Sequence, residues 1–450
     1  MKSFKAGKEL RDKVSRKSQG NFTIVAREKT IIELINESNV DRVPELIPIR
    51  HQRMSVSPFS FYRGAAGIMA HDLSTLPNTD IRVQAIGDCH LMNFGGFATP
   101  ERILVFDAND FDETLPASWE WDIKRLATSF VLAGRENSFS ESDSEQLAYT
   151  LVHTYRQQLY EYTQMNFLEL WYTKFDFEDL RRNAKIPEAR RLLSEEIEKA
   201  NKQSHDKVFY KITTNTLGNF EITDQPPLIY HPLDVKKHRD EISSFIDQYT
   251  QTLQDDRRWL FEKYTLIDVA LKVVGVGSVG TRCFVVLLMN KKEEPLFLQV
   301  KEARRSVLEP YTGKSLYAHN GQRVVEGQRL VQAASDIFLG WSTDQNGRHF
   351  YFRQLRDRKI SPEIANKDKV ILSVYAKLCG RALARAHAKT GDAALISGYM
   401  GKSDILDQTI AKFAVSYADQ TEKDYKDFMK AIKKGSLPTE PKRLKKMKTI

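Results

Sequence analysis

The chain has few cysteines and no long hydrophobic run, and both shortages restrict its class. Only three of its 450 residues are cysteines (Cys89, Cys283 and Cys379), and they lie far apart. An odd number of widely spaced cysteines excludes a disulfide framework or a cysteine-rich zinc module, and it suits a reducing compartment. No apolar run approaches the roughly 20 residues that a membrane helix needs. The N-terminus is basic without the apolar core of a signal peptide, so we expect a soluble cytoplasmic protein.

The hydrophobic content suffices for a packed core, whereas the net charge does not identify a binding partner. Hydrophobic residues make up 41% of the chain and charged residues 28%, which excludes wholesale disorder. The net charge is +9, and part of the excess lies in the tail at 433–450. Such a tail is typical of a disordered, solvated terminus; the alternative is an arm that binds nucleic acid or a membrane surface.

The chain alternates between β-rich and helical stretches. Residues 80–112 and 265–355 indicate short strands joined by Gly and Pro turns, whereas residues 120–265 show helical periodicity with many charges. Further helices are predicted at 28–37, 369–390 and 404–432. The unusual residues are concentrated in the two β-rich stretches.

The first chemical motif is the loop Gly87-Asp88-Cys89-His90-Leu91-Met92-Asn93. An Asp that can accept a hydroxyl proton, with an Asn five positions later to bind Mg²⁺, is the D-x-x-x-x-N arrangement of kinase catalytic loops. A polar turn capped by Asp88 and Asn93 is the structural alternative. We expect His90 to order the loop by hydrogen bonding rather than to bind metal.

The second motif is the acidic run FDANDFDE at 106–113, which follows an apolar strand. Four acids in seven residues repel one another unless a cation lies among them. Mg²⁺ or Mn²⁺ held by Asp107 or Asp110 suits oxygen ligands better than zinc does. The alternative is an exposed acidic turn, and the spacing does not fit an EF-hand.

The third motif is a glycine turn with Gly275, Gly277, Ser278 and Gly280. Its G-x-G-x-x-G spacing also occurs in dinucleotide-binding folds, but there the turn opens a helix. Here the turn leads into TRCFVVLLM, whose β-branched and aromatic residues predict a strand. A strand–glycine turn–strand hairpin is the element that covers nucleotide phosphates in kinases; a purely structural hairpin is the alternative.

The strand after this hairpin ends on Lys301. In kinases a Lys at this place contacts the α- and β-phosphates and pairs with a Glu from the next helix. The helix predicted at 321–335 offers Glu326, with Glu302 and Glu309 as rivals, and a hinge is expected at 352–355. Arg63 has no counterpart in this scheme; a phosphate, the acids at 107–113 or a structural salt bridge are its candidate partners.

These parts follow one another in a cyclically permuted kinase order. A kinase runs from glycine loop, Lys, Glu and hinge to catalytic loop, metal Asp and helical lobe, whereas this chain begins at the catalytic loop. Permutation is tolerated where the termini are close together at the surface.

We predict an α+β, two-lobed protein-kinase-like fold, circularly permuted, with a largely helical lobe and a small antiparallel-sheet lobe. The expected parts are a helical extension (1–50), the catalytic-loop and helical lobe (51–265), the nucleotide-binding β-rich lobe (266–360), helices completing the helical lobe (361–432) and the basic tail (433–450).

Long segments of the chain, over about residues 40 to 430, resemble the bacterial family known as domain of unknown function 2252. They include SPFSFYRG (57–64), GDCHLMNFGGF (87–97), FDANDFDE (106–113) and GVGSVGTRCFVVLL (275–288). The resemblance implies a link to protein-kinase-like proteins, especially aminoglycoside phosphotransferase relatives. Their G-D-x-H-x-x-N loop is matched by Gly87, Asp88, His90 and Asn93, and the helix start at Asp122 resembles theirs loosely. The permuted order departs from those relatives, and it leaves the metal Asp ambiguous between two positions.

We therefore expect an ATP- and Mg²⁺-dependent phosphotransferase, with Mn²⁺ as the alternative metal, acting on an unknown small-molecule or protein acceptor. In this interpretation Asp88 orients or deprotonates the acceptor, and Lys301 with Glu326 positions phosphates. Nucleotidyl transfer, a nucleotide-binding pseudokinase or scaffold without turnover, and a metal-dependent hydrolase are the alternatives. The expected metal ligands are Asn93 with Asp107 or Asp110, and the expected phosphate-covering residues are Gly275, Gly277, Ser278 and Gly280.

Overall fold

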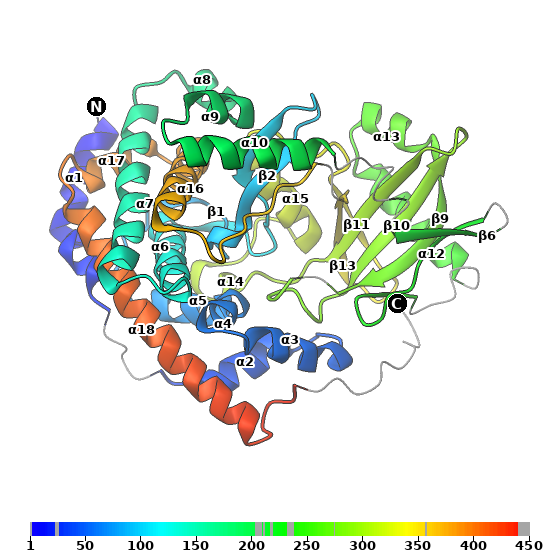
Figure 1. Ribbon diagram of the computed structural model, residues 1–450, viewed down its shortest axis with the longest axis horizontal. Helices are drawn as coiled ribbons and strands as arrows, with labels where there is room; N and C mark the ends of the chain where they lie inside the picture. Colours follow the sequence, from blue (N-terminus) through cyan, green and yellow to red (C-terminus); the bar gives the residue numbers. More distant parts are fainter. Residues whose placement is uncertain are drawn as a thin grey trace.

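The computed structural model describes residues 2–22, 27–202, 209, 212–216, 219–231, 238–273, 275–355 and 358–439. The fold is α+β, with a large helical body beside a six-stranded antiparallel sheet (Figure 1). Helix α15 (Asn320–Val331) lies between these two parts and contacts α16 on one side and β12 and β13 on the other. The candidate site lies where α15, the sheet and the helical body meet.

Four long helices form the centre of the helical body. They are α6 (Trp119–Glu136), α7 (Glu141–Tyr162), α16 (Lys369–Thr390) and α18 (Ile405–Lys433). Helix α7 packs on α6, α16 and α18, and every residue of α6 from 119 to 134 is buried. The smaller helices of this body are α8 (Phe167–Tyr172), α9 (Phe177–Asn183), α10 (Pro187–Asn201) and α17 (Ala393–Met400).

The N-terminal segment adds short helices, of which α2 to α5 lie below the helical body in Figure 1. Helix α2 begins where Thr30 and Glu33 form a capping box, which satisfies otherwise unpaired N–H groups of the first turn. Helix α18, from the other end of the sequence, packs on both α2 and α4. These elements are α1 (Lys2–Lys13), α2 (Ile31–Asn39), α3 (Ile47–Met54), α4 (Pro58–Gly64) and α5 (Ala66–Ser74).

The described residues form three further, small antiparallel sheets. Strand β1 (Arg82–Ala85) pairs with β4 (Leu115–Ser118). The Asp88 loop and the acidic run at 106–113 lie between these two strands in the sequence. Between them β2 (Phe94–Ala98) pairs with β3 (Leu104–Ala108), and β3 also pairs with β5 (Phe175–Asp176). Strands β6 (Thr213–Thr216) and β7 (Asn219–Ile222) form a separate hairpin.

The large sheet has the strand order β12-β13-β11-β10-β9-β8. Its central strand β10 is an almost continuous apolar run because both faces are covered: Val286 and Leu288 point to one core cluster, and Val285 and Leu287 to another. Helices α12 (Arg239–Gln251) and α13 (Asp255–Phe261) contribute to the first cluster. The strands are β8 (Ile229–Tyr230), β9 (Tyr264–Lys272), β10 (Cys283–Asn290), β11 (Pro295–Glu302), β12 (Gly340–Thr343) and β13 (His349–Gln354), and α14 (Glu309–Thr312) follows β11.

The long helices agree best with the sequence-based prediction. The helices expected at 369–390 and 404–432 are confirmed as α16 and α18, whereas α4 and α5, which lie beyond the predicted helical extension (1–50), had no predicted counterpart. Of the predicted basic tail, 440–450 lie outside the described residues; before them Leu437 is buried in a core cluster. Among the described residues, no helix combines the length and apolar character needed to cross a membrane.

Candidate functional site

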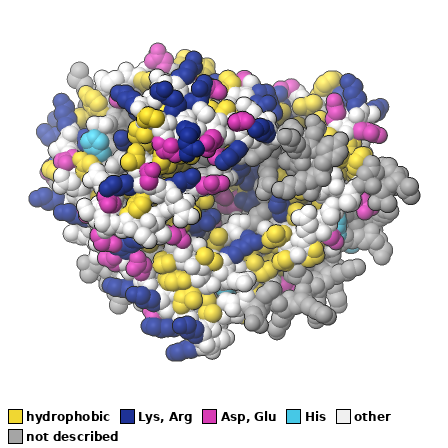
Figure 2. All heavy atoms as spheres, viewed as in Figure 1, with side chains coloured by type: hydrophobic (Ala, Val, Ile, Leu, Met, Phe, Trp, Pro, Cys, Tyr) yellow, Lys and Arg dark blue, Asp and Glu magenta, His cyan; other side chains and the backbone are white. Residues whose placement is uncertain are grey.

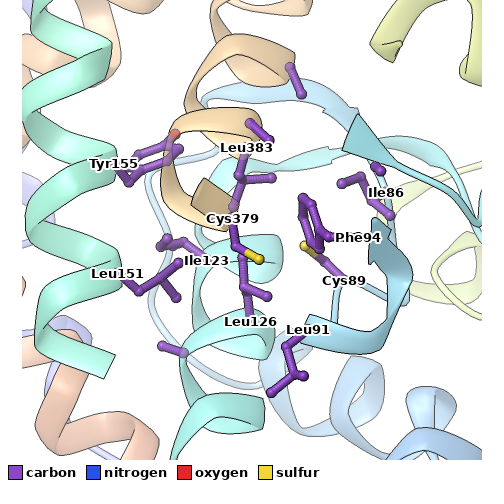
Figure 3. Packing of buried hydrophobic residues seen from close by; sticks show 14 of the residues in the cluster. Ile86, Cys89, Leu91, Phe94, Ile123, Leu126, Leu151, Tyr155, Cys379 and Leu383 are labelled. Carbon is purple, nitrogen blue, oxygen red and sulfur yellow. The ribbon is translucent and has the colours of Figure 1, made fainter. Parts of the chain in front are cut away.

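The loop that carries Asp88 is held in place by Asp122 of α6 and by the packing of its own apolar side chains. The carboxylate of Asp122, in the first turn of α6, accepts hydrogen bonds from the backbone N–H groups of Ile86 (2.7 Å) and Gly87 (3.0 Å). Gly87 has φ +88°, which a residue with a side chain rarely adopts. After Asp88 the chain turns its apolar side chains inward, and Figure 3 shows Cys89, Leu91 and Phe94 packed into the core. Core packing therefore fixes the position of Asp88.

The two carboxylate oxygens of Asp88 have different surroundings. Arg125 donates to Oδ1 through Nε (2.8 Å) and through a terminal nitrogen (2.5 Å). Oδ2 accepts no hydrogen bond from any described residue; His90 Nε2 lies 3.8 Å away. The side-chain amide of Asn93 donates to the Asp88 carbonyl (2.8 Å), so Asn93 braces the same loop. One oxygen of Asp88 is thus fixed, and the other faces a cavity.

His90 is an uncharged part of this loop. Burial lowers its pKa well below the ordinary value, and the nearby cations Arg63 and Arg125 lower it further. Its backbone N–H donates to the Asp88 carbonyl (2.9 Å). A neutral imidazole beside Asp88 adds no positive charge that would compete with Arg125 for the carboxylate.

The structure separates the two Asp candidates for metal binding. Asp107 lies in β3 with 1% exposure, and its Oδ2 accepts from Arg385 (2.6 Å) and from the backbone of Ala333 (2.9 Å). Arg385 is itself fully buried. Asp107 therefore joins α16 and the segment after α15 to β3, and these contacts give it a structural role. Asp110, just beyond β3, lines both cavities of the site.

Lys301 lies at the end of β11 and faces the acidic run. Its ammonium donates to Asp112 Oδ2 (2.6 Å) and lies 3.9 Å from Asp110 Oδ2. The hydroxyl of Tyr351, on the neighbouring strand β13, donates to the other oxygen of Asp112 (2.6 Å). Although burial opposes it, the two carboxylates raise the pKa of Lys301 well above its ordinary value, so the ammonium stays charged.

The two acids beside Lys301 differ in how well their charge is stabilised. Burial and the neighbouring carboxylate of Asp112 raise the pKa of Asp110. For Asp112 burial acts in the same direction, but Lys301 and Tyr351 outweigh it and lower its pKa. The ionised form of Asp110 is thus the one that a further cation would stabilise.

Helix α15 approaches this cluster through Arg323 instead of the expected Glu326. Glu326 forms an ion pair with Arg329 (3.0 Å) on the helix surface, and Lys301 has Asp112 as its partner. Arg323, 2% exposed, donates to the carbonyls of Asp112 (2.8 Å) and Thr114 (2.6 Å). The helix therefore positions the backbone of the acidic run.

The glycine turn closes over Asp88. A Cβ atom built on Gly277 would lie 3.9 Å from Asp88 Oδ2 and 3.1 Å from the Arg63 carbonyl, so a side chain there would occupy the space above the carboxylate. Gly275 (φ +68°) and Gly280 (φ +91°) have backbone conformations that favour glycine. The N-terminal segment holds the turn from outside: the backbone N–H of Val43 donates to the Gly280 carbonyl (2.8 Å).

Two cavities meet at this place. The first, of about 500 Å³, lies against the sheet and is here called the sheet-side cavity; it is lined by Lys301, Arg353 and the β13 end at Gln354 and Leu355. The second, of about 320 Å³, contains Asp88, His90 and Asn93 and is called the Asp88 cavity. Both are lined by Asp110, Gly275 and Ser278, so the glycine turn forms a roof over their junction. Within the described residues, no three His, Cys, Asp or Glu side chains converge as a preformed metal site.

The comparisons with known proteins place the chain in a family. The model of a family described as "Uncharacterized protein conserved in bacteria (DUF2252)" matches residues 42–431. The chain belongs to the DUF2252 family. No curated protein and no solved structure matches it. The part of the chain that matches the DUF2252 model includes Asp88, the acidic run, the glycine turn and Lys301.

Several residues of this DUF2252 site were not chosen from the sequence. Asp112 accepts from Lys301 and from Tyr351. Arg125 donates to the carboxylate of Asp88, and Arg323 donates to the backbone carbonyl of Asp112. Asp112 could have been found, because it follows Asp110 by two residues in the same acidic run. The other three come from elements whose pairing with the site is visible only in the fold.

Proposed function

We propose that this chain binds ATP with Mg²⁺ in the sheet-side cavity and transfers the γ-phosphoryl group to a hydroxyl of an acceptor held in the Asp88 cavity. The observation that carries this proposal is the junction of the two cavities. There a glycine turn, the charged Lys301 and the poorly stabilised Asp110 are adjacent to Asp88, whose Oδ2 is open to the acceptor side. Phosphoryl transfer depends mainly on positioning and charge neutralisation, which these groups supply.

The sheet topology supports a kinase-like arrangement. Strands β9, β10 and β11 form a meander, the glycine turn joins the first two, and Lys301 lies on the third. The short helix α14 and then α15 follow, and the β12–β13 hairpin adds to β11. The order glycine turn, Lys strand, helix and hinge is that of the small lobe of protein kinases. We infer a two-lobed kinase-like fold in circularly permuted order, because Asp88 and Asp110 precede this unit in the chain.

The residues present suit Mg²⁺ bound together with nucleotide phosphates. Mg²⁺ is commonly held by one or two carboxylates plus substrate phosphates rather than by an all-protein cage. Asp110 offers a carboxylate at the cavity junction, and Asn93 lies on the Asp88 side. Bound there, the ion would neutralise phosphate charge.

The chemical step requires a proton acceptor and a leaving group. The acceptor oxygen forms a bond to the γ-phosphorus while the bond from that phosphorus to the β–γ bridging oxygen breaks, and ADP leaves with the electron pair. Asp88 Oδ2 takes the hydroxyl proton. Arg125 keeps Oδ1 fixed at 2.5 and 2.8 Å, so the carboxylate is oriented before the acceptor arrives.

The metal assignment predicts that Asp110→Asn lowers Mg²⁺-dependent ATP turnover by about 100-fold or more, because Asn lacks the charge that would hold the ion. The measurement is release of labelled γ-phosphate, to water or to added hydroxyl compounds, over a series of Mg²⁺ concentrations. Asp256→Asn, an exposed acid on α13, is the matched control and should turn over like wild type. Wild-type turnover by Asp110→Asn at all Mg²⁺ concentrations would remove Asp110 from the metal site.

A nucleotide-binding protein without turnover is the second candidate. The close Lys301–Asp112 pair favours it, because a Lys engaged by a carboxylate is less available to phosphates. In that case ATP binds in the sheet-side cavity, but no product forms. The substitution of Asp88 treated in the Discussion separates these two functions.

A further inference from the structure

The Asp88 cavity has an unusual supply of arginine. Four arginines line it that pair with no carboxylate in the described part of the chain: Arg42, Arg50, Arg63 and Arg304. Most of its acids, in contrast, already have a cation. Asp88 pairs with Arg125, Asp112 with Lys301, Glu302 with Arg282 and Glu37 with Lys29; Asp110 has only the more distant Lys301, at 3.9 Å, and Glu113 forms no ion pair with a described residue. The side of the cavity away from Asp110 is therefore positive.

Three of these arginines have a structural role at the end of α2. Arg42 donates to the Ser38 carbonyl (2.8 Å), Arg304 to the Val40 carbonyl (2.6 Å) and Arg50 to the side-chain oxygen of Asn39 (2.5 Å). Cations near a helix C-terminus are stabilised by its exposed carbonyl groups. These contacts explain why three guanidinium groups gather here, but not why Arg63 joins them.

Arg63 is the guanidinium without an acceptor. It is half-buried at the end of α4, and in the described structure its side chain makes no hydrogen bond or ion pair. Its Nε is fully shielded from solvent. The guanidinium carbon of Arg63 lies over the ring of Phe59, 6.0 Å from the ring centre, in a cation–π contact. Burial lowers its pKa, while Asp88 and Asp110 act in the opposite direction. A shielded N–H group such as this Nε costs free energy when it has no acceptor, and an anion at Arg63 would supply one.

We propose that Arg63 binds an anionic group of the acceptor, so that this site phosphorylates a small hydroxyl compound that already carries a phosphate or a carboxylate. The inference rests on the proposed function, since it names the acceptor class for the same site. Arg presents a planar fork that matches both anions with two hydrogen bonds. Arg304 and Arg50 add positive potential on the same wall.

Two observations favour the acceptor over the nucleotide as the source of this anion. Arg63 and Asp88 line the Asp88 cavity, whereas Lys301, Arg353 and Lys272 line the sheet-side cavity that is proposed for ATP. The volume of about 320 Å³ is at the lower end of small-molecule sites, which suits a compact metabolite better than a peptide segment. An anion held at Arg63 would place the rest of such a molecule beside Asp88 Oδ2.

The test is a calorimetric titration of inorganic phosphate into the full chain saturated with Mg²⁺ and a non-hydrolysable ATP analogue. We expect phosphate to bind under these conditions, and Arg63→Gln to weaken it about tenfold or more. Arg305→Gln is the matched control. Arg305 lines the same cavity but is exposed and paired with Glu309, so its loss should change phosphate affinity by less than about twofold.

Three results would overturn the inference. Phosphate binding that Arg63→Gln leaves unchanged would show that Arg63 is not its ligand. Phosphate that binds the free chain but is displaced by the ATP analogue would assign Arg63 to the γ-phosphate of the nucleotide. Absence of phosphate binding to the wild-type chain, with or without the analogue, would remove the anion site altogether.

If the ATP analogue fails to bind while phosphate still requires Arg63, the proposed function fails and the anion site stands. Arg63→Lys, which keeps the charge without the fork, serves if Arg63→Gln does not fold.

Discussion

Asp88→Asn is expected to lower ATP turnover by about 10²- to 10⁴-fold while nucleotide affinity changes by less than about twofold. Asn has nearly the same shape, but it cannot take the hydroxyl proton through the atom that replaces Oδ2. Binding should survive because Asp88 lines the acceptor side and not the sheet-side cavity. Turnover is measured as release or transfer of labelled γ-phosphate, and affinity by calorimetry on the same preparation.

The fold of the Asp88→Asn variant has to be confirmed by its melting curve, since Arg125 loses a charged partner. Arg125 keeps a hydrogen bond to the Tyr62 carbonyl (3.1 Å) and its position over the Tyr62 ring, so we expect a folded protein. Turnover equal to wild type in a folded variant would exclude Asp88 as the base. Nucleotide binding without turnover in the wild-type chain would instead favour the non-catalytic alternative.

The second large effect is expected on stability. Asp107→Ala should lower the free energy of unfolding by about 3–5 kcal/mol, because it leaves the guanidinium of Arg385 buried without its carboxylate. The pair joins β3 to α16 at 2.6 Å, and both side chains are inaccessible to solvent. The measurement is urea denaturation followed by circular dichroism.

Two further variants make this result specific. Asp427→Ala removes an exposed ion pair on α18 and should leave the unfolding curve unchanged within error. Asp110→Asn should leave stability unchanged or raise it slightly. Its folded-state pKa is raised, so at neutral pH the ionised carboxylate is disfavoured by folding, and this cost disappears with the charge. A stable Asp107→Ala protein, or a strongly destabilised Asp110→Asn protein, would reverse the roles assigned to the two residues.

The parts of the site that sequence analysis located depend on local patterns. The glycine turn and Lys301 belong to one pair of consecutive hairpins, so their proximity follows from strand–turn–strand alternation alone. Helix α16 spans 369–390 as predicted, because its apolar periodicity continues without a proline. Asp88 and Asn93 lie on one short loop, where the spacing itself brings them together.

The parts that could not be predicted depend on contacts between distant segments. Whether Asp107 or Asp110 faces the cavities is decided by Arg385, which lies 278 positions further along the chain. The predicted helix at 321–335 ends at Val331, because Gln332 turns to extended backbone and its side chain donates to the Ala108 carbonyl. The same tertiary contacts place Arg323 at the acidic run and leave Glu326 at the surface. Periodicity reports which face of a helix is apolar, but not which element will cover it.

The most direct test of the central claim is a calorimetric titration of ATP with Mg²⁺ into the wild-type chain and Lys301→Met. We expect micromolar binding that Lys301→Met weakens about tenfold or more, which corresponds to about 1.4 kcal/mol. Lys263→Met, an exposed Lys next to the start of β9, is the control and should bind as wild type does. Melting curves verify that all three proteins are folded. Equal affinity in wild type and Lys301→Met, or binding of the metal alone without ATP, would contradict a nucleotide site between the glycine turn and Lys301.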